Sequence, residues 1–255
     1  MNSIYDIFSV KKKKVLITGA ANGNGRVIAE AFGRAGSQLC LVDVDAENLT
    51  SVAESIEKET KQRVDRYVVD LSIFDDIDKF LVNNNNFDVV INNAGITRGN
   101  TFFEYNDSDW ELTHRVNLYA PYKIIQKIAK NMAKRKTGSI INVTSLAAEL
   151  GFPSNPAYVS SKGALKQLTK AAACDLACYG IRVNSVGPGY IKTNMTQKSW
   201  SDCELRSDRT KRTLMERWGE SSDLIGIMIF LASDSSSYVT GQDFYIDGGW
   251  LSKGL

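Results

Sequence analysis

The chain has 255 residues, of which 43% are hydrophobic and 24% are charged, values typical of a globular protein large enough for one α/β domain. Its formal net charge of +2 gives no overall field that would recruit nucleic acid or an anionic membrane. No apolar run approaches the roughly 18 to 20 residues that cross a bilayer, so neither a membrane protein nor a nucleic-acid-binding protein is expected.

Residues 1–13 are expected to form a short arm that docks before the first strand. The basic run Lys11 to Lys14 follows the mildly apolar part of this arm, which is the reverse of a secretory signal. We interpret the run as a solvated strand entrance, with a phosphate-facing patch as the alternative.

The four cysteines do not make a disulfide framework in a chain of this length, and a reducing cytoplasm is the predicted compartment. Cys174 and Cys178 lie four residues apart on a predicted helix, a spacing that also suits a shared metal ion. His114 is the only imidazole available to complete such a site, so no metal is predicted.

Short β-branched segments alternate along the chain with longer amphipathic segments, such as residues 46–60 and 161–180. Seven strands are predicted, at residues 15–18, 39–43, 66–70, 88–92, 139–144, 181–186 and 243–247. Apolar strands separated by helices of this length indicate parallel β-α-β units with both faces of the sheet covered. No repeat or linker divides the chain, so residues 1–255 are predicted to form a single doubly wound α/β domain.

The first predicted strand runs through a glycine-rich turn into a helix. Gly19, Gly23 and Gly25 occupy positions where a Cβ would hinder a tight turn or hold the backbone away from a pyrophosphate. The following helix offers unpaired N–H groups and a positive dipole end to such an anion. The glycine pattern alone is also compatible with an ordinary strand-to-helix turn.

Asp43 favours the dinucleotide interpretation of this turn. It ends the second predicted strand 18 residues after Gly25, close to the roughly 20 expected for a carboxylate that binds a ribose 2′-hydroxyl. Neither Asn22 in the turn nor Val44 after the acid is cationic, so a 2′-phosphate would meet a negative charge with no adjacent cation. We therefore predict NAD as the cofactor and expect NADP to be disfavoured.

Seven short motifs follow one another along the chain: TGAANGNG (18–25), NNAG (92–95), Asn117 in RVNLYAPY, Ser145 in INVTS, YVSSK (158–162), PGYIKT (188–193) and VTGQDFYIDGG (239–249). In these motifs and their order, the chain resembles the short-chain dehydrogenase/reductase (SDR) family from about residue 10 to its end. Asn24 departs from the apolar residue usual in the family and is expected to alter packing beneath the nicotinamide side of the turn. The resemblance implies a Rossmann-type sheet of seven strands in the order 3-2-1-4-5-6-7, and a homotetramer, or else a dimer.

Tyr158 and Lys162 lie one helical turn apart, so the ammonium is expected near the phenol. A neighbouring cation lowers the pKa of a tyrosine, which would make Tyr158 a general base for an alcohol, or an acid for a carbonyl in reverse. Ser145 is expected to stabilise charge on the substrate oxygen. The resemblance assigns Asn117 a water that relays protons from Lys162, and these four are the predicted catalytic residues.

The same motifs imply which residues contact the cofactor. Asp70 is expected to face the adenine, the Ile191 backbone to meet the carboxamide, and Thr193 to bind the carboxamide or the diphosphate, whereas Asn92 also fits a purely structural role. The predicted cofactor-binding residues are Gly19, Asn22, Gly23, Asn24, Gly25, Asp43, Asp70, Leu71, Asn93, Ala94, Gly95, Tyr158, Lys162, Pro188, Gly189, Ile191 and Thr193.

Residues 194 to about 216 are predicted to form the lid over the substrate. This segment is rich in both charge signs and poor in aliphatic side chains, which favours a small hydroxylated substrate over a steroid or a long acyl chain. Its cationic part, residues 206–212, is compatible with attraction of an anionic substrate and equally with a solvated mobile segment.

Five local segments resemble gluconate 5-dehydrogenases and related sugar-acid or polyol dehydrogenases: FSVKKKKVLITGA (8–20), SLAAELG (145–151), YIKTNMTQ (190–197), KRTLMERWGESSDLIG (211–226) and DFYIDGGWL (243–251). By that likeness, Arg98 is expected to bind a carboxylate and Glu149 to bind hydroxyls, together with Ser145 and Tyr158. Both charged residues also fit a surface or structural role.

The main hypothesis is an NAD-dependent dehydrogenase of a sugar acid, a polyol or a similar secondary alcohol. A 3-oxoacyl-(acyl-carrier-protein) reductase is the alternative. Such an enzyme is expected to use NADPH and to have a basic docking patch, and Asp43 and Val44 disfavour NADPH. A catalytically silent NAD(H)-binding regulator is the third, which the intact Ser145, Tyr158 and Lys162 disfavour.

Overall fold

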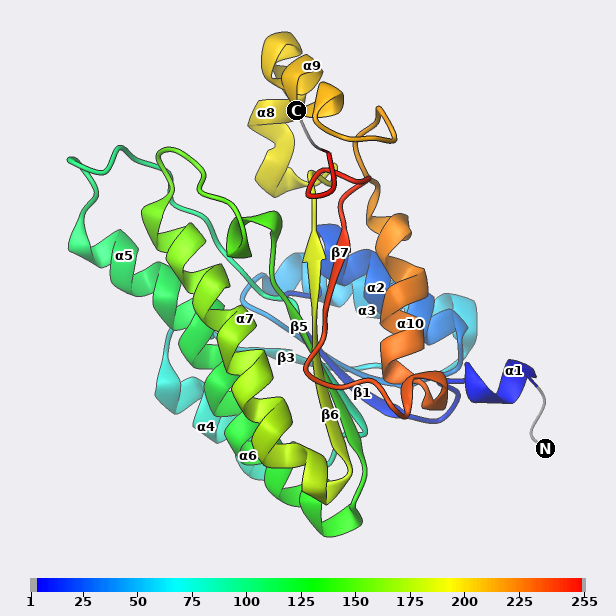
Figure 1. Cartoon of the computed structure of the whole chain (residues 1–255). Coiled ribbons are helices and arrows are strands. Elements are labelled where there is room, and N and C mark those ends of the chain that lie inside the picture. The colour runs from blue at the N-terminus through cyan, green and yellow to red at the C-terminus, as the bar shows by residue number, and fades with distance from the viewer. Residues whose placement is uncertain (1–3, 254–255) are drawn as a thin grey trace.

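Seven parallel strands form the centre of the computed structural model, which describes residues 4–253 (Figure 1). Their order, 3-2-1-4-5-6-7, is the predicted one. Every predicted strand is present, with ends that differ by no more than two residues from those expected. The strands are β1 (Lys14–Thr18), β2 (Gln38–Asp43), β3 (Asp65–Val68), β4 (Val89–Asn92), β5 (Gly138–Val143), β6 (Ile181–Pro188) and β7 (Asp243–Ile246).

Helices cover both faces of this sheet, with α2, α3 and α10 on one face and α4, α6 and α7 on the other (Figure 1). The α-helices are α1 (Ile4–Ile7), α2 (Gly23–Arg34), α3 (Ala46–Thr60), α4 (Phe74–Asn83), α5 (Asp107–His114), α6 (Ala120–Arg135), α7 (Pro156–Leu176), α8 (Gln197–Ser201), α9 (Cys203–Lys211) and α10 (Ile225–Ala232). Short turns of 3-10 or π geometry are η1 (Arg115–Tyr119), η2 (Leu146–Ala148), η3 (Ala177–Tyr179), η4 (Asn194–Thr196), η5 (Ser221–Leu224) and η6 (Asp234–Ser236). None of the helices within residues 4–253 is long and apolar enough to cross a membrane.

The core consists of two apolar layers, one on each side of the sheet. Successive side chains of a strand point to opposite faces, so Leu16 enters one layer and Ile17 enters the other, and both are fully buried. β4 and β5 are buried along their whole length, as expected for central parallel strands. Burying one such aliphatic side chain stabilises the fold by about 1.5–3 kcal/mol, so the two layers hold the strand ends firmly in place.

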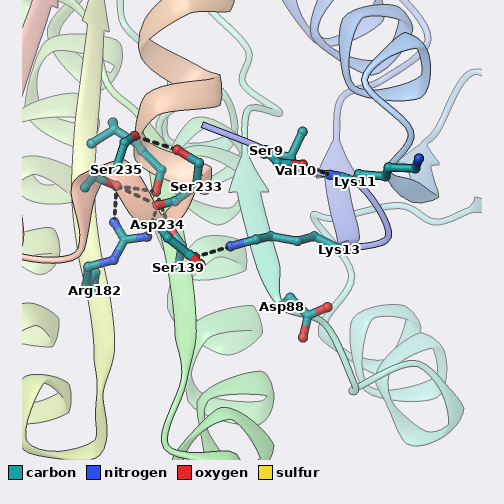
Figure 2. Close-up of polar contacts among 12 residues, drawn as sticks. Ser9, Val10, Lys11, Lys13, Asp88, Ser139, Arg182, Ser233, Asp234 and Ser235 are labelled. Carbon is teal, nitrogen blue, oxygen red and sulfur yellow. Dashed lines mark hydrogen bonds and ion pairs between the residues drawn. The ribbon is translucent and has the colours of Figure 1, made fainter. Parts of the chain in front are cut away.

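The basic run Lys11 to Lys14 lies at the amino-terminal ends of the strands, directly before and at the start of β1. Lys13 Nζ lies 2.7 Å from Asp234 Oδ1, and the preceding Val10 is buried (Figure 2). In the same region Arg182 donates to the carbonyl of Ser233 at 3.2 Å (Figure 2). The amino-terminal ends of the strands lie opposite α8 and α9 in the sheet (Figure 1). The structure therefore supports the interpretation of the basic run as a strand entrance.

The predicted lid is helical and lies beyond the carboxyl ends of β6 and β7, where α8 and α9 stand out from the body (Figure 1). Aromatic side chains anchor it. Trp218 is buried, its indole N–H donates to the carbonyl of Arg206 at 3.2 Å, and its ring lies 5.2 Å from that of Trp200. Tyr190 in turn contacts Trp218 at 5.1 Å and stacks on Trp250 at 5.3 Å. The lid is therefore held by ring contacts rather than by aliphatic packing.

Candidate active site

A cavity of about 730 Å³ opens at the carboxyl ends of the strands. Its walls come from the loops that follow β1 to β6 and from the first part of the lid. Parallel sheets of this kind place their ligands at that edge, because the strand order reverses between β1 and β4 and leaves a crevice there. Most of the sequence-predicted site residues meet in this cavity.

The glycine turn forms the floor at one end of the cavity. Gly19 and Gly23 have φ values of +66° and +52°, which a residue with a Cβ adopts only with strain. A Cβ on Gly19 would also lie 2.7 Å from the Cα of Ala94. Gly25 does not line the cavity; a Cβ there would lie 1.9 Å from the Gly19 carbonyl oxygen, so this glycine lets α2 pack against the turn.

The amino-terminal end of α2 faces the same space. Its N-cap residue, Asn22, makes no side-chain cap hydrogen bond, and the first turn of the helix contains no acidic residue. The helix itself therefore contributes no carboxylate that would offset the partial positive charge of this end. A turn without room for side chains, followed by an uncapped helix end, fits the pyrophosphate of a dinucleotide.

Two carboxylates mark the far wall of this half of the cavity. Asp43 ends β2, and its oxygens accept from the backbone N–H groups of Ala21 at 2.9 Å and Asp45 at 3.1 Å. Asp70 follows β3 and accepts from the backbone and the hydroxyl of Ser72 at 2.8 and 2.7 Å. These contacts fix both side chains at the cavity wall, where either can accept from a ligand hydroxyl or amine.

The NNAG segment joins the glycine turn to the end of β4. The side chain of Asn93 donates to the carbonyls of Thr18 and Gly19, both at 3.0 Å, so it holds the turn against the sheet. Asn92 points elsewhere and donates to Asn142 at 2.8 Å in the core. Asn93, Ala94 and Gly95 line the cavity. Asn92 does not, and its hydrogen bond in the core fits the purely structural role that the sequence also allowed.

Ser145, Tyr158 and Lys162 come together at the other end of the cavity, which all three line. Lys162 is 3% exposed and donates to the Val143 carbonyl at 2.7 Å. Burial lowers the pKa of this ammonium to about 8. The Oγ of Ser145 accepts from the Ala147 N–H at 3.1 Å, which orients the hydroxyl at the end of β5.

The protein's own groups raise the pKa of Tyr158, contrary to the lowering expected from its spacing to Lys162. Burial of the hydroxyl raises that pKa, and the hydrogen bond with Ser145 opposes the rise only in part. Lys162 Nζ lies 5.8 Å from the centre of the phenol ring and is aimed at Val143, so its charge does not lower the pKa as the sequence spacing suggested. The nearby Tyr190 adds to the rise.

Asn117 lies behind these groups and does not line the cavity. It is fully buried in the π turn η1, donates to the Ile96 carbonyl at 3.0 Å and accepts from the Ile96 N–H at 2.9 Å. A Cβ on Gly95 would lie 3.4 Å from both the Asn117 Oδ1 and the Lys162 Nζ, so the two polar groups border the same small gap. π turns of this kind occur frequently at functional sites.

The segment after β6 closes the cavity from above. Pro188, Gly189, Ile191 and Thr193 all line it, as expected. Thr193 faces the glycine turn, since a Cβ on Gly23 would lie 3.4 Å from it. The unusual Asn24 also lines the cavity, and its Oδ1 accepts from the Ser221 hydroxyl at 2.8 Å, which ties the turn to η5.

The two proposed substrate residues are placed differently. Arg98 lines the cavity, although its side chain is 56% exposed and lies 3.9 Å from a carboxylate oxygen of Asp109. Glu149 does not line the cavity; it is paired with Lys166 and accepts from the Tyr245 hydroxyl at 2.6 Å. Lys166 is the main reason that the pKa of Glu149 is lowered.

Tyr190, just before the lid, and Arg209, on α9, are among the cavity residues that sequence reasoning missed. The Arg209 guanidinium lies 4.8 Å from the centre of the Tyr190 ring, and Phe152 contacts the same ring at 6.2 Å. The sequence signal for Arg209 is the three-residue spacing of the arginines at 206, 209 and 212, within the cationic part of the lid. Only a three-dimensional arrangement shows which of them turns inward.

Within residues 4–253, no group of three or more His, Cys, Asp or Glu side chains is arranged to hold a metal ion. Cys174 and Cys178 are exposed on α7 and η3. The imidazole of His114 contacts the Ser160 hydroxyl at 3.1 Å and the Trp110 carbonyl at 2.9 Å.

Comparisons with known proteins agree with this geometry. Residues 19–251 match the family model described as enoyl-(acyl carrier protein) reductase. The 5-keto-D-gluconate 5-reductase of Escherichia coli is 36% identical over 253 residues, covering 96% of this chain and 98% of that one. The 3-oxoacyl-(acyl-carrier-protein) reductase of Thermotoga maritima is 37% identical, covering 93% and 97%. The crystal structure of a gluconate 5-dehydrogenase from Burkholderia cenocepacia, in complex with NADP and tartrate, has a TM-score of 0.93 at 33% identity, covering 99% and 100%.

Proposed function

Because the chain belongs to the short-chain dehydrogenase/reductase family, we propose that it is an NAD-dependent dehydrogenase that oxidises a secondary alcohol of a sugar acid, or reduces the corresponding ketone. The observation that carries this proposal is the single cavity in which the glycine turn and Asp43 meet Ser145, Tyr158 and Lys162. Such a cavity brings a dinucleotide and a hydroxyl substrate to the same phenol.

The dinucleotide would lie along the half of the cavity formed by β1 to β4. We assign its pyrophosphate to the glycine turn and the α2 end, its ribose to Asp43 and its adenine to Asp70 and Leu71, all of which line the cavity. When bound, the nicotinamide supplies the hydride acceptor or donor. Thr193, facing Gly23, would close over this half from the lid side.

The protein's own contribution to the reaction is placement and proton transfer. Tyr158 would move a proton to or from the substrate oxygen, and Ser145 would donate a hydrogen bond to that oxygen. Lys162, with its pKa lowered to about 8, can exchange its own proton near neutral pH and so pass one on from the phenol. Asn117, which borders the same gap as Lys162, would position the group that receives it.

We propose NAD as the preferred cofactor because of the charges around the ribose site. Asp43 and Asp45 lie next to each other there, and Val44 between them is 64% exposed. Among the described residues that line the cavity, the cations are Arg98, Lys162 and Arg209, which come from other loops and helices. A 2′-phosphate would therefore meet the Asp43 carboxylate without a compensating cation. The Burkholderia relative, solved with NADP, makes the cofactor the first property to measure.

A 3-oxoacyl-(acyl-carrier-protein) reductase is the second candidate, because the Thermotoga relative with that name is as similar in sequence as the gluconate enzymes. Both candidates use the same proton-transfer residues, so the substrate and the cofactor distinguish them. The test is an assay of the purified protein with D-gluconate and NAD, and in parallel with a 3-oxoacyl thioester and NADPH, following the absorbance of reduced nicotinamide. Turnover of the first pair supports the main proposal, whereas turnover of the second pair alone overturns it.

We also propose that the chain self-associates as a tetramer. Three aromatic side chains on α5 and around the start of α6 are 41–47% exposed: Trp110, Tyr119 and Tyr122. Aromatic residues are enriched at the centres of protein interfaces. Light scattering coupled to size-exclusion chromatography measures the mass, and the proposal is wrong if only the monomer of 28.2 kDa elutes.

A further inference from the structure

The substrate end of the cavity contains a guanidinium that no carboxylate neutralises. Arg209, on the lid helix α9, lines the cavity, and no carboxylate of residues 4–253 lies within ion-pair distance of it. Its Nη1 donates to the Leu205 carbonyl at 3.3 Å. Its Nε is buried and has no hydrogen-bond partner.

A buried N–H group without a partner is unfavourable by about 1–3 kcal/mol, and by more when the group is charged. The other two arginines of the lid do not share this state. Arg212 is paired with Asp208 at 3.1 Å, and Arg206 faces a separate hollow of about 790 Å³ behind the lid, where it lies over Trp200. Arg209 is thus the lid arginine that lines the cavity without a carboxylate partner, and its one internal hydrogen bond goes to a backbone carbonyl.

The position of Arg209 is fixed by an aromatic ring close to the reacting phenol. Its guanidinium carbon lies 4.8 Å from the centre of the Tyr190 ring, a cation–π distance. Tyr190 is near enough to Tyr158 to raise the pKa of that residue, so Arg209 is one ring away from the proton-transfer group. A stacked guanidinium keeps its N–H edges free for a planar acceptor.

The charges that line the cavity are separated by sign. Asp43 and Asp70 lie at the dinucleotide end, whereas Arg98, Lys162 and Arg209 come from the segments around the substrate end. Arg98 is the weaker candidate for an anion, because it is 56% exposed and faces Asp109. Lys162 is directed to the Val143 carbonyl. This leaves Arg209 as the cavity cation with no carboxylate partner, and its guanidinium can donate charge-assisted hydrogen bonds to a carboxylate.

We propose that Arg209 binds the carboxylate of the substrate and selects sugar acids over the corresponding neutral polyols. This inference rests on the proposed function, since it concerns the substrate of the same site. It transfers to Arg209 the role that the sequence suggested for Arg98. It also gives the lid a function in recognition, because the arginine reaches the cavity only when α9 lies over Tyr190.

The test compares D-gluconate with D-sorbitol, which has a hydroxymethyl group in place of the carboxylate. We expect Arg209→Gln to lower kcat/KM for D-gluconate by about 10- to 100-fold, the range for loss of a charge-assisted hydrogen-bond pair, and to change kcat/KM for D-sorbitol by less than about twofold. Arg209→Lys should restore part of the loss. Arg206→Gln, on the same helix but facing the other hollow, should leave both substrates within about twofold.

Three outcomes overturn the inference. If Arg209→Gln lowers turnover of both substrates equally, the arginine only supports the lid. If Arg98→Gln shows the acid-selective loss and Arg209→Gln does not, Arg98 is the anchor. The third outcome concerns binding alone and requires no turnover. If D-gluconate does not bind when it is titrated into the wild-type NADH complex in a calorimeter, the inference is wrong. Failure of the proposed function is a separate result, namely no hydride transfer with any sugar acid or polyol.

Discussion

The two ends of the cavity are built in different ways. The dinucleotide end consists of tight turns and strand ends within the first 95 residues, where Gly19, Asp43 and Asn93 are fixed by backbone contacts. The substrate end combines Phe152, Tyr190 and Arg209, which are far apart in sequence and are held by ring contacts. The first end is rigid and depends on local sequence, whereas the second depends on tertiary packing of the lid. We therefore expect substitutions at the two ends to separate cofactor binding from substrate recognition.

The largest expected effect lies where the two ends meet. Tyr158→Phe should reduce kcat by about 10²- to 10⁴-fold, the range for loss of a general acid or base, because Tyr158 is the cavity phenol that is hydrogen-bonded to Ser145. The dissociation constant for NADH, measured by fluorescence, should change by less than about threefold. A variant with near-wild-type turnover would show that another group transfers the proton.

At the dinucleotide end, Asp43→Ala should shift the ratio of kcat/KM for NAD over NADP by about 10- to 100-fold toward NADP, because it removes one charge that repels a 2′-phosphate and one acceptor for the ribose hydroxyl. Steady-state kinetics with both cofactors at a fixed substrate concentration measure this ratio. Glu47→Ala, an exposed acid in the first turn of α3, is the matched control and should leave the ratio unchanged. An unchanged ratio in Asp43→Ala would place cofactor selection elsewhere.

Lys162 lies between the two ends of the cavity, and Lys162→Met should lower the activity while raising the stability of the fold. The downward shift of the Lys162 pKa from 10.5 to about 8 corresponds to about 3 kcal/mol by which burial disfavours its charged form. Loss of the hydrogen bond to Val143 opposes the gain, so Lys162→Met should raise the free energy of unfolding by about 1–3 kcal/mol at pH 7.

The pH dependence of this gain follows from the direction of the shift. The unfolded chain holds the Lys162 proton up to about pH 10.5, whereas the folded chain releases it near pH 8, so wild-type stability rises with pH across that window. The advantage of Lys162→Met should therefore shrink between pH 8 and pH 10.5 in urea titrations. A gain that does not depend on pH would contradict the role of desolvation. Lys166→Met, which removes the partner of Glu149, should destabilise the protein instead.

The smallest expected effect concerns the contact between the ends. Ser221→Ala removes the hydrogen bond to Asn24, which is worth about 0.5–1.5 kcal/mol, so the KM for NAD should rise by about two- to tenfold. The neighbouring Ser222 is exposed, and Ser222→Ala should behave as wild type. Equal kinetics for the two variants would mean that the Asn24 contact does not hold the turn.

The fold and the dinucleotide end could be predicted because their signals are local. A run such as VLI (15–17) is apolar at every position because both faces of the strand are covered, and Gly19 is required by a positive φ in a tight turn. The seven strands followed from such patterns, and their order followed from the family resemblance.

The substrate end could not be predicted in the same way, because sequence spacing does not give the direction in which a side chain points. Residues four apart on a helix share a face, but the sequence could not show that Lys162 points to Val143 rather than to the phenol oxygen, and the sign of the Tyr158 pKa shift was wrong for that reason. In the same way, Glu149 is four residues from Ser145 yet turns to Lys166 and Tyr245. Arg209 enters the cavity only because α9 packs over Tyr190.

The most direct test of the joint role of the two ends is a crystal structure of the Tyr158→Phe variant with NAD and D-gluconate. We expect the adenosine ribose at Asp43, the reacting carbon of the substrate between Ser145 and the nicotinamide, and the carboxylate on Arg209. A nucleotide bound outside the glycine turn, or a gluconate whose reacting carbon lies away from Ser145, would contradict it.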